Sequence, residues 1–129
     1  MAGWLWGFLV LFTACQSGAR TDQPPDIRWG EDPCDECHMI ISERRFAAGY
    51  HTAEGTTFRF DDIGCMLQHL RQRSDSVSSV WVVDYTTGKW LPAAQALFVH
   101  SREIITPMGH GIVAVSSPAE ADALTRRYQ

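Results

Sequence analysis

The number of cysteines constrains the fold of this chain more than any other feature of its sequence. The 129 residues include four of them, Cys15, Cys34, Cys37 and Cys65. If Cys15 closes an export signal, three cysteines remain in the folded part, and an odd number of thiols cannot all pair within one chain. The chain is therefore not a disulfide-bonded scaffold, even in an oxidising compartment. At least one thiol has another role.

Residues 1–14 have no charged side chain and are dominated by Trp, Leu, Phe and Val. The stretch is shorter than the about 20 residues of a membrane-spanning helix, but it has the length of the apolar region of a secretory signal. Residues 11–15, Leu-Phe-Thr-Ala-Cys, resemble the lipobox of bacterial lipoproteins, whose cysteine is acylated and becomes the mature N-terminus. We therefore expect a signal peptide over residues 1–14 and a lipid anchor at Cys15. A simple cleaved signal or a buried N-terminal helix is the alternative.

Residues 15–33 are polar and rich in Pro, Gly and Asp, which predicts a flexible tether between a membrane and a domain over residues 34–129. We expect the protein to be exported and to face the periplasm or the cell exterior. Gln16, directly after the anchor, favours the outer membrane where the cell has one. The net charge is −4 and no Lys/Arg-rich run occurs, which excludes nucleic-acid binding and a polybasic membrane patch.

Hydrophobic patterning over the rest of the chain predicts short strands and two helices. Residues 46–60 have the composition of a β-hairpin with its turn near Gly55. A helix capped by Asp61 or Asp62 follows, and a last helix begins at the capping box Ser117–Glu120. Further strands are expected over residues 79–85, 96–100 and 111–116.

The order of these elements repeats once along the chain. Aligning residues 58–72 with residues 113–127 puts strand on strand, cap on cap and helix on helix, although the two sequences differ. We predict an α+β fold made of two small tandem ββαβ-like units, with antiparallel sheets and one packed helix each.

The segment Cys34–Met39 reads Cys-Asp-Glu-Cys-His-Met. A two-residue gap lets two thiolates converge on one ion, and Met39 adds a thioether two residues after Cys37. Thiolate and thioether together select copper(I), whereas zinc rarely takes methionine. The segment therefore predicts a copper(I) site with Cys34, Cys37 and Met39 as ligands.

Four other interpretations of this segment stay open. A redox Cys-x-x-Cys pair usually sits at a helix N-terminus after a strand, which does not fit this position. A disulfide between Cys34 and Cys37 is accessible in an oxidising compartment. Zinc would take both thiols with His38 and Cys65, and would leave Met39 unused. The segment also spells C-x-x-C-H, the pattern of covalent c-type haem attachment, although the surrounding strands are untypical of a small cytochrome.

A second cluster, Phe60–Met66, places Cys65 in the first turn of the expected helix. Free amide donors and the helix dipole there favour thiolate and predict a lowered pKa for Cys65, which suits a ligand or a nucleophile. The alternative is a small core residue, which is the better interpretation for its neighbour Met66. A thiol-dependent enzyme that uses Cys65 beside the preceding aspartates is the catalytic alternative.

A third cluster, Thr106–Gly111, holds Met108 and His110. Met108 is flanked by Pro and Gly in a loop, so that packing explains it poorly. An exposed thioether beside an imidazole is a reasonable pair of copper ligands.

Together the three clusters resemble the NosL family, copper-binding lipoproteins that are accessory to nitrous oxide reductase maturation. The resemblance implies a tandem ββαβ fold and a copper(I) site, with the family's C-x-M at Cys37 and Met39 and its loop methionine at Met108. The matching stretches are Cys37–Met39, Arg45–Ala48, Phe60–Met66, Trp90 and Thr106–Gly111.

The chain departs from the family pattern where His38 replaces a common glycine and where Cys34 adds a second thiol. We predict a copper(I) metallochaperone rather than an enzyme. Its recipient would be an exported copper enzyme, such as nitrous oxide reductase or a terminal oxidase, or the assembly proteins of that enzyme. The predicted ligands are Cys34, Cys37, Met39 and Met108, with Cys65, His110 and His38 as further candidates.

Overall fold

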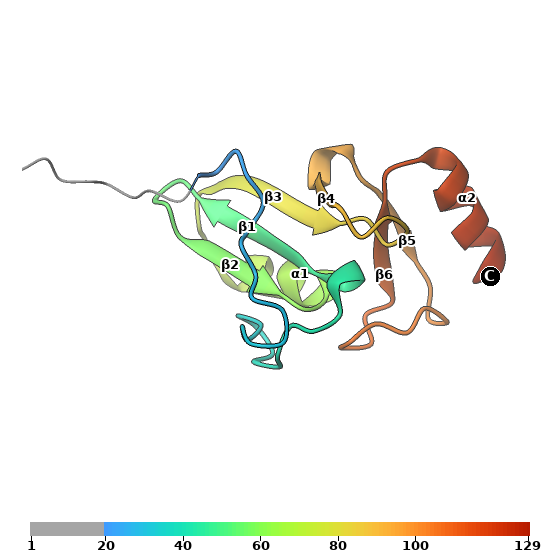
Figure 1. Cartoon of the computed structure of the whole chain (residues 1–129), viewed down its shortest axis with the longest axis horizontal. Coiled ribbons are helices and arrows are strands. Elements are labelled where there is room, and N and C mark those ends of the chain that lie inside the picture. The colour runs from blue at the N-terminus through green and yellow to red at the C-terminus, as the bar shows by residue number, and fades with distance from the viewer. Residues whose placement is uncertain (1–19) are drawn as a thin grey trace, which may run out of the picture.

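The computed structural model describes residues 20–129, so the expected signal peptide and Cys15 lie outside the described residues. The predicted hairpin forms, with β1 (Ala48–Thr52) paired antiparallel to β2 (Thr57–Phe60). β1 also pairs with β3 (Val77–Val83), and β3 pairs with the short β4 (Trp90–Pro92), again antiparallel. These strands make one four-stranded sheet in the order β2-β1-β3-β4 (Figure 1).

The sheet is covered on both faces at β1. Tyr50 points toward α1 (Ile63–Gln72), where its ring centroid lies 6.1 Å from that of His69. Gly49 points to the opposite face, because neighbouring residues of a strand alternate between faces. There Pro25 lies directly on the strand, since a Cβ on Gly49 would come within 2.6 Å of Pro25 Cγ. All of β1 is buried as a result.

Residues 25–29 are packed on the sheet, within the stretch of residues 15–33 over which we expected a flexible tether. Pro25 and Ile27 are buried, and the Trp29 ring lies 6.5 Å from that of Trp90 in β4. Figure 1 shows this segment, in blue, crossing the sheet. Its few apolar residues follow no period, and Pro25 docks on the bare backbone of Gly49, so hydrophobic patterning could not reveal the contact.

The second unit consists of β5 (Leu97–His100), β6 (Ile112–Val115) and α2 (Pro118–Arg127). The two strands pair antiparallel as a separate sheet, and α2 packs beside them (Figure 1). The capping box forms as predicted, because the Ser117 hydroxyl accepts the N–H of Glu120 at 3.2 Å. A second core joins these elements; its buried members are Phe46, Val99, Ile104, Val113, Val115 and Leu124.

Asp84 connects the two units just after β3. Its Oδ1 accepts the N–H groups of Thr86 and Thr87 at 2.8 and 3.1 Å. Its Oδ2 accepts the N–H of Ser116, in the second unit, at 2.9 Å. Burial alone would raise the pKa of Asp84, but these hydrogen bonds outweigh it and hold the pKa below its usual value. The ionised carboxylate therefore stabilises the junction.

The antiparallel α+β architecture is confirmed, and both helices begin at predicted caps. β4 was not predicted, because its three residues are too few for strand alternation to show. Within residues 20–129 the second unit has two strands and a helix but no closing strand. Neither described helix is long and apolar enough to cross a membrane.

Candidate metal centre

Three cysteines and one aspartate converge where β2 ends and α1 begins. The Sγ atoms of Cys34, Cys37 and Cys65 and one carboxylate oxygen of Asp61 all lie within 4.8 Å of one another. Cys34, Cys65 and Asp61 are buried, whereas Cys37 is half-buried. These four residues, called the thiol cluster below, are a preassembled set of metal ligands that meets solvent at Cys37.

The loop over residues 34–39 folds back so that its two thiols face the same point. The N–H of Cys34 donates to the carbonyl of Met39 at 2.8 Å, and the N–H of His38 donates to the carbonyl of Cys34 at 3.0 Å. His38 adopts a φ of 66°, in the left-handed region that residues other than glycine rarely enter. This residue makes the reversal that brings the chain back alongside Cys34.

The two residues between the loop cysteines attach the loop to its neighbours. Asp35 exchanges two hydrogen bonds with Arg59 of β2, donating its N–H at 2.8 Å and accepting the N–H of Arg59 through Oδ2 at 2.7 Å. Glu36 Oε2 lies 3.0 Å from Nδ1 of His69 on α1. The loop thiols are therefore positioned by contacts to the two elements that flank the rest of the cluster.

Asp62 caps α1 and attaches a second loop beside the cluster. It is fully buried, and its Oδ1 accepts the N–H of Gly64 at 2.8 Å while its Oδ2 accepts the N–H of Met108 at 2.9 Å. Since Asp62 is the cap, Asp61 is free to face the thiols. Both Asp61 oxygens lie 3.4 Å from Cys37 Sγ, so the Cys37 thiol donates to this carboxylate.

The buried thiols of the cluster resist ionisation. Burial raises the pKa of Cys34 to about 12, although three backbone N–H groups act in the opposite direction. Burial also raises the pKa of Cys65 well above its ordinary value, and electrostatic interaction with Cys34 and with the Asp61 carboxylate adds to the shift. Our expectation of a lowered pKa for Cys65 was wrong, because burial and nearby negative charge outweigh the helix N-terminus. These thiols keep their protons until a metal ion displaces them.

Comparison with known proteins decides the family. The model of the NosL family matches residues 29–129, which is most of the chain. The chain belongs to the NosL family.

The fold agrees with this assignment. The crystal structure of the copper chaperone NosL from Shewanella denitrificans matches with a TM-score of 0.69 at 21% sequence identity, and the match covers 82% of this chain and 87% of that chain. None of the curated proteins compared with the chain matches it.

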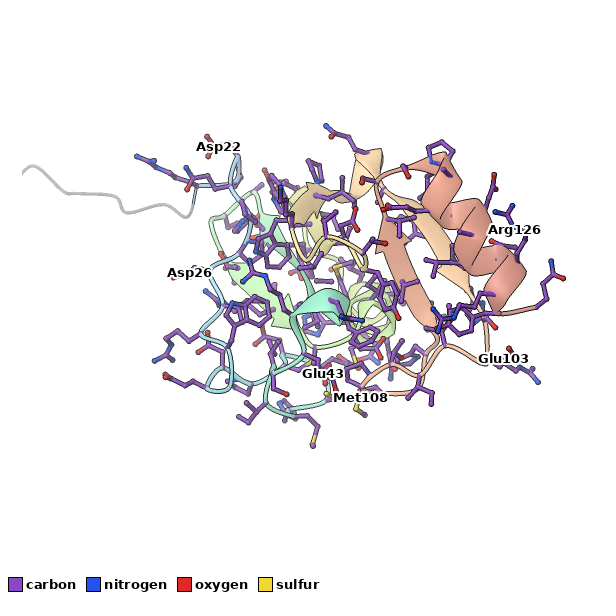
Figure 2. All side chains as sticks on the ribbon, turned by 45° about the vertical axis from the view of Figure 1, so that its right-hand side comes forward. Asp22, Asp26, Glu43, Glu103, Met108 and Arg126 are labelled. Atoms are coloured by element: carbon purple, nitrogen blue, oxygen red, sulfur yellow. The ribbon has the colours of Figure 1, made fainter. Side chains whose placement is uncertain are left out.

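In this member of the NosL family, both predicted thioether ligands lie at the surface, outside the thiol cluster. Met39 is 58% exposed, and Met108, which is labelled in Figure 2, is 42% exposed. Both remain beside the cluster, since Met39 follows Cys37 by two residues and the Met108 backbone is bonded to Asp62. The structure therefore brings together the predicted thiols and leaves the two thioethers exposed to solvent, outside the cluster.

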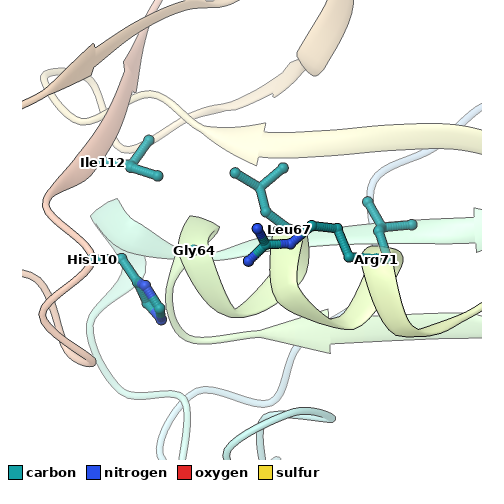
Figure 3. A pocket seen from close by; sticks show the side chains of 6 residues that line it. Gly64, Leu67, Arg71, His110 and Ile112 are labelled. Carbon is teal, nitrogen blue, oxygen red and sulfur yellow. The ribbon is translucent and has the colours of Figure 1, made fainter.

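The two histidine candidates also lie outside the cluster. The side chain of His38 is exposed. Its left-handed backbone gives a physical reason for the glycine that is common at this place in the NosL family, because glycine enters that region without strain. His110 packs against the helix instead, since a side chain on Gly64 would overlap its Cβ and Cγ (Figure 3).

A surface cavity beside α1 is separate from the metal centre. It has a volume of about 480 Å³, and none of the four cluster residues lines it. Its walls are Gly64, Leu67, Leu70, Arg71, His110 and Ile112 (Figure 3).

Asp61 is the cluster residue that sequence reasoning missed as a ligand, because we considered it only as a helix cap or as a partner of a catalytic thiol. The signal was the pair Asp61-Asp62 before one helix. One N-cap residue serves one helix, so the other aspartate was available for a different role.

The geometry of the cluster disfavours the haem and enzyme alternatives. Covalent haem attachment needs both loop cysteines to reach one haem, but Cys34 has no exposed surface. A catalytic thiol needs access to substrate and a reachable thiolate, whereas Cys65 is buried and its pKa is raised. Cys34, Cys37 and Cys65 are all free thiols. Metal binding is the chemistry that this arrangement suits best.

Proposed function

We propose that this chain is a copper(I) chaperone that holds the ion on the thiol cluster. The observation that carries the proposal is the convergence of three cysteine sulfurs within 4.8 Å. Thiolate sulfur is the soft ligand that copper(I) prefers, and a monovalent ion is satisfied by two or three such ligands. Membership of the NosL family, and the similar fold of a NosL copper chaperone, support copper as the metal.

Copper(I) loading releases protons from the cluster. The pKa of Cys34 is about 12 and that of Cys65 is also raised, so both are thiols at neutral pH and ionise only as the metal binds. Cys37 is half-buried whereas Cys34 and Cys65 are buried, so its thiol is the one that solvent reaches. The half-buried Cys37 is therefore the ligand that meets the incoming ion.

Exchange takes place on the solvent side of the cluster, where Met39 and Met108 are exposed. Their thioethers bind copper(I) without deprotonation, so they serve as weak ligands for an ion on its way in or out. His38 and His110 are further ligands of the exchange stage. A site with strong ligands inside and weak ligands outside holds copper(I) firmly yet lets a partner protein take it.

The proposal includes export and membrane anchoring through a lipid on Cys15, with the domain facing the periplasm or the cell exterior. It rests on the apolar run and lipobox-like segment of residues 1–15. The recipient is an exported copper enzyme, for which nitrous oxide reductase is the first candidate and a terminal oxidase the second.

An anaerobic titration of the reduced full-length protein with copper(I), in competition with a coloured copper(I) chelator, tests the proposal. We expect one tightly held ion per chain, and loss of stoichiometric binding in the variant Cys34→Ser/Cys37→Ser. Cys15→Ser is the matched control, because it removes a thiol outside the cluster and should leave the titration unchanged. Stoichiometric binding by the double variant would contradict the assignment.

Delivery is tested by mixing the copper-loaded protein with copper-free nitrous oxide reductase. We expect copper to reach the enzyme faster from the loaded protein than from the copper(I)–chelator complex at equal total copper. Equal rates of copper transfer from both donors would contradict the chaperone role, and the protein would then be a copper store.

A further inference from the structure

The thiol cluster contains one ligand that a copper(I) site does not call for. Asp61 is 3% exposed, and its carboxylate lies among sulfur atoms. Copper(I) selects sulfur, whereas carboxylate oxygen is a regular ligand of harder divalent ions and occurs together with thiolates at zinc. A buried carboxylate is also costly unless it is hydrogen-bonded or paired with a cation.

We propose that the three thiols and the Asp61 carboxylate form a closed, four-coordinate site for a divalent ion of the zinc type. This inference concerns a second ion and does not depend on the binding of copper(I). It also differs from zinc binding through His38, because His38 is exposed and Asp61 stands in the fourth position.

The dimensions of the cluster fit such an ion. Zinc–sulfur bonds of about 2.3 Å and zinc–oxygen bonds of about 2.0 Å, arranged tetrahedrally, put two sulfurs about 3.8 Å apart and a sulfur and an oxygen about 3.5 Å apart. The distance from Cys37 Sγ to each Asp61 oxygen is 3.4 Å. Since all four ligand atoms lie within 4.8 Å of one another, closing the tetrahedron needs shifts of at most about 1 Å.

The backbone around Cys34 is arranged for a sulfur that becomes negative. The N–H groups of Glu36, Cys37 and Asp61 all interact with its thiol. Glu36 and Cys37 belong to the loop over residues 34–39, whereas Asp61 directly follows β2, so the N–H groups reach this sulfur from two segments of the chain. These N–H groups would stabilise a thiolate at Cys34, the most deeply buried ligand, once a bound metal ion compensates the negative charge of the cluster.

Zinc and copper(I) then compete for the same three sulfurs, but only zinc uses Asp61. Removing the carboxylate should separate the two ions. Asp61→Asn keeps the size of the side chain and removes the charge, so it should weaken the divalent site and spare the copper(I) site. Asp122→Asn is the matched control, because Asp122 is an exposed aspartate on α2.

Cobalt(II) is the spectroscopic probe for zinc in this experiment. The reduced full-length protein is titrated anaerobically with Co²⁺, then with Zn²⁺ to displace it, and separately with copper(I) against a chelator. We expect one Co²⁺ per chain, with thiolate-to-cobalt charge-transfer bands and the visible bands of tetrahedral coordination. Asp61→Asn should lower the Co²⁺ and Zn²⁺ affinities at least about tenfold, since loss of even an outer partner of a metal ligand has that effect. Its copper(I) affinity should match that of the wild type.

Each other outcome decides a different point. A six-coordinate Co²⁺ spectrum without thiolate bands, or unchanged Co²⁺ affinity in a folded Asp61→Asn variant, overturns the divalent site and leaves the copper proposal standing. Tetrahedral Co²⁺ binding without any copper(I) binding overturns the copper proposal instead. A circular dichroism spectrum that matches the wild type reports that the Asp61→Asn variant is folded. If that variant does not fold, the wild-type spectrum still decides whether the site is tetrahedral and rich in thiolate.

Discussion

Asp62 is the residue whose replacement should disturb the candidate site most without removing a ligand. It is fully buried, and its two carboxylate oxygens do different work: Oδ1 caps α1 through Gly64, and Oδ2 holds the loop of Met108. Asp62→Ala removes both hydrogen bonds. Asp62→Asn keeps one acceptor oxygen, which can still cap the helix, and puts an NH₂ group where the other N–H donor needs an acceptor.

The structure sets the expected magnitudes. Loss of an N-cap costs about 1 kcal/mol of folding free energy. Loss of a hydrogen bond to a charged group costs about 1.5–3 kcal/mol, because the partly buried N–H of Met108 is left without its acceptor. We therefore expect Asp62→Ala to lower the free energy of unfolding by about 3 kcal/mol and Asp62→Asn by about 2 kcal/mol. In both variants the Met108 loop is released from its attachment to the helix.

Urea denaturation followed by circular dichroism measures both changes, with unchanged m-values as the check on two-state unfolding. The second readout is the rate at which a chelator removes copper(I), which should rise in Asp62→Asn as the loop is freed. If Asp62→Asn is within about 0.5 kcal/mol of the wild type, the hydrogen bond to the loop contributes no more than an ordinary surface contact and the reasoning is refuted.

Four further predictions concern steric fit and pH. Gly64→Ala should lower the free energy of unfolding in urea by about 1 kcal/mol or more, because overlap with His110 outweighs the higher helix propensity of alanine; a more stable variant would contradict this. Asp84→Asn should cost about 2 kcal/mol at pH 7 in the same assay, since one oxygen that accepts N–H groups becomes a donor. Folding lowers the pKa of Asp84, so the stability that its carboxylate contributes is present above pH 3.8 and is lost as pH falls through the folded-state pKa. The acid unfolding curve of Asp84→Asn should therefore lack this loss of stability. The metal-free protein should lose stability as pH rises from 9 towards 12, because folding raises the pKa of Cys34 to about 12, and denaturation midpoints across this range measure the loss. Copper(I) affinity in the chelator assay should fall as the pH is lowered, since protons compete with the metal for the same thiols.

Much of the fold was readable from local patterns. The hairpin, α1, β5, β6 and α2 follow from aromatic and β-branched runs, two cap residues and a capping box, each of which acts within a few residues. The packing of residues 24–29 on the sheet was not readable. It depends on the absence of a side chain at Gly49, which lets Pro25 lie on the strand, and no periodic signal records a contact between such distant residues.

The sequence predicted the thiols of the candidate site but not how the side chains are arranged around them. Soft-ligand chemistry selected Cys34, Cys37 and Cys65 from the sequence, and the structure brings them together. The same chemistry selected Met39 and Met108, but side-chain exposure depends on how two loops meet the start of α1, and both thioethers lie at the surface. The pKa of Cys65 was misjudged for a related reason, because a helix N-terminus can be read from sequence while burial cannot.

Burial divides the ligands of this site by strength, and that division is what a carrier of copper(I) requires. Cys34 and Cys65 are enclosed, so thiolates formed there face little competition from water for the ion. Cys37 is half-buried and shares its loop with the exposed Met39, so the proposed exchange would begin at this loop. A partner that presents its own sulfur ligand would displace the thioethers first and Cys37 next, and would meet the two buried thiolates last. The copper(I) ion would therefore pass from ligand to ligand without entering bulk water. A divalent ion in the proposed four-coordinate site would block this transfer, because Cys37 and Asp61 would both be bound to it.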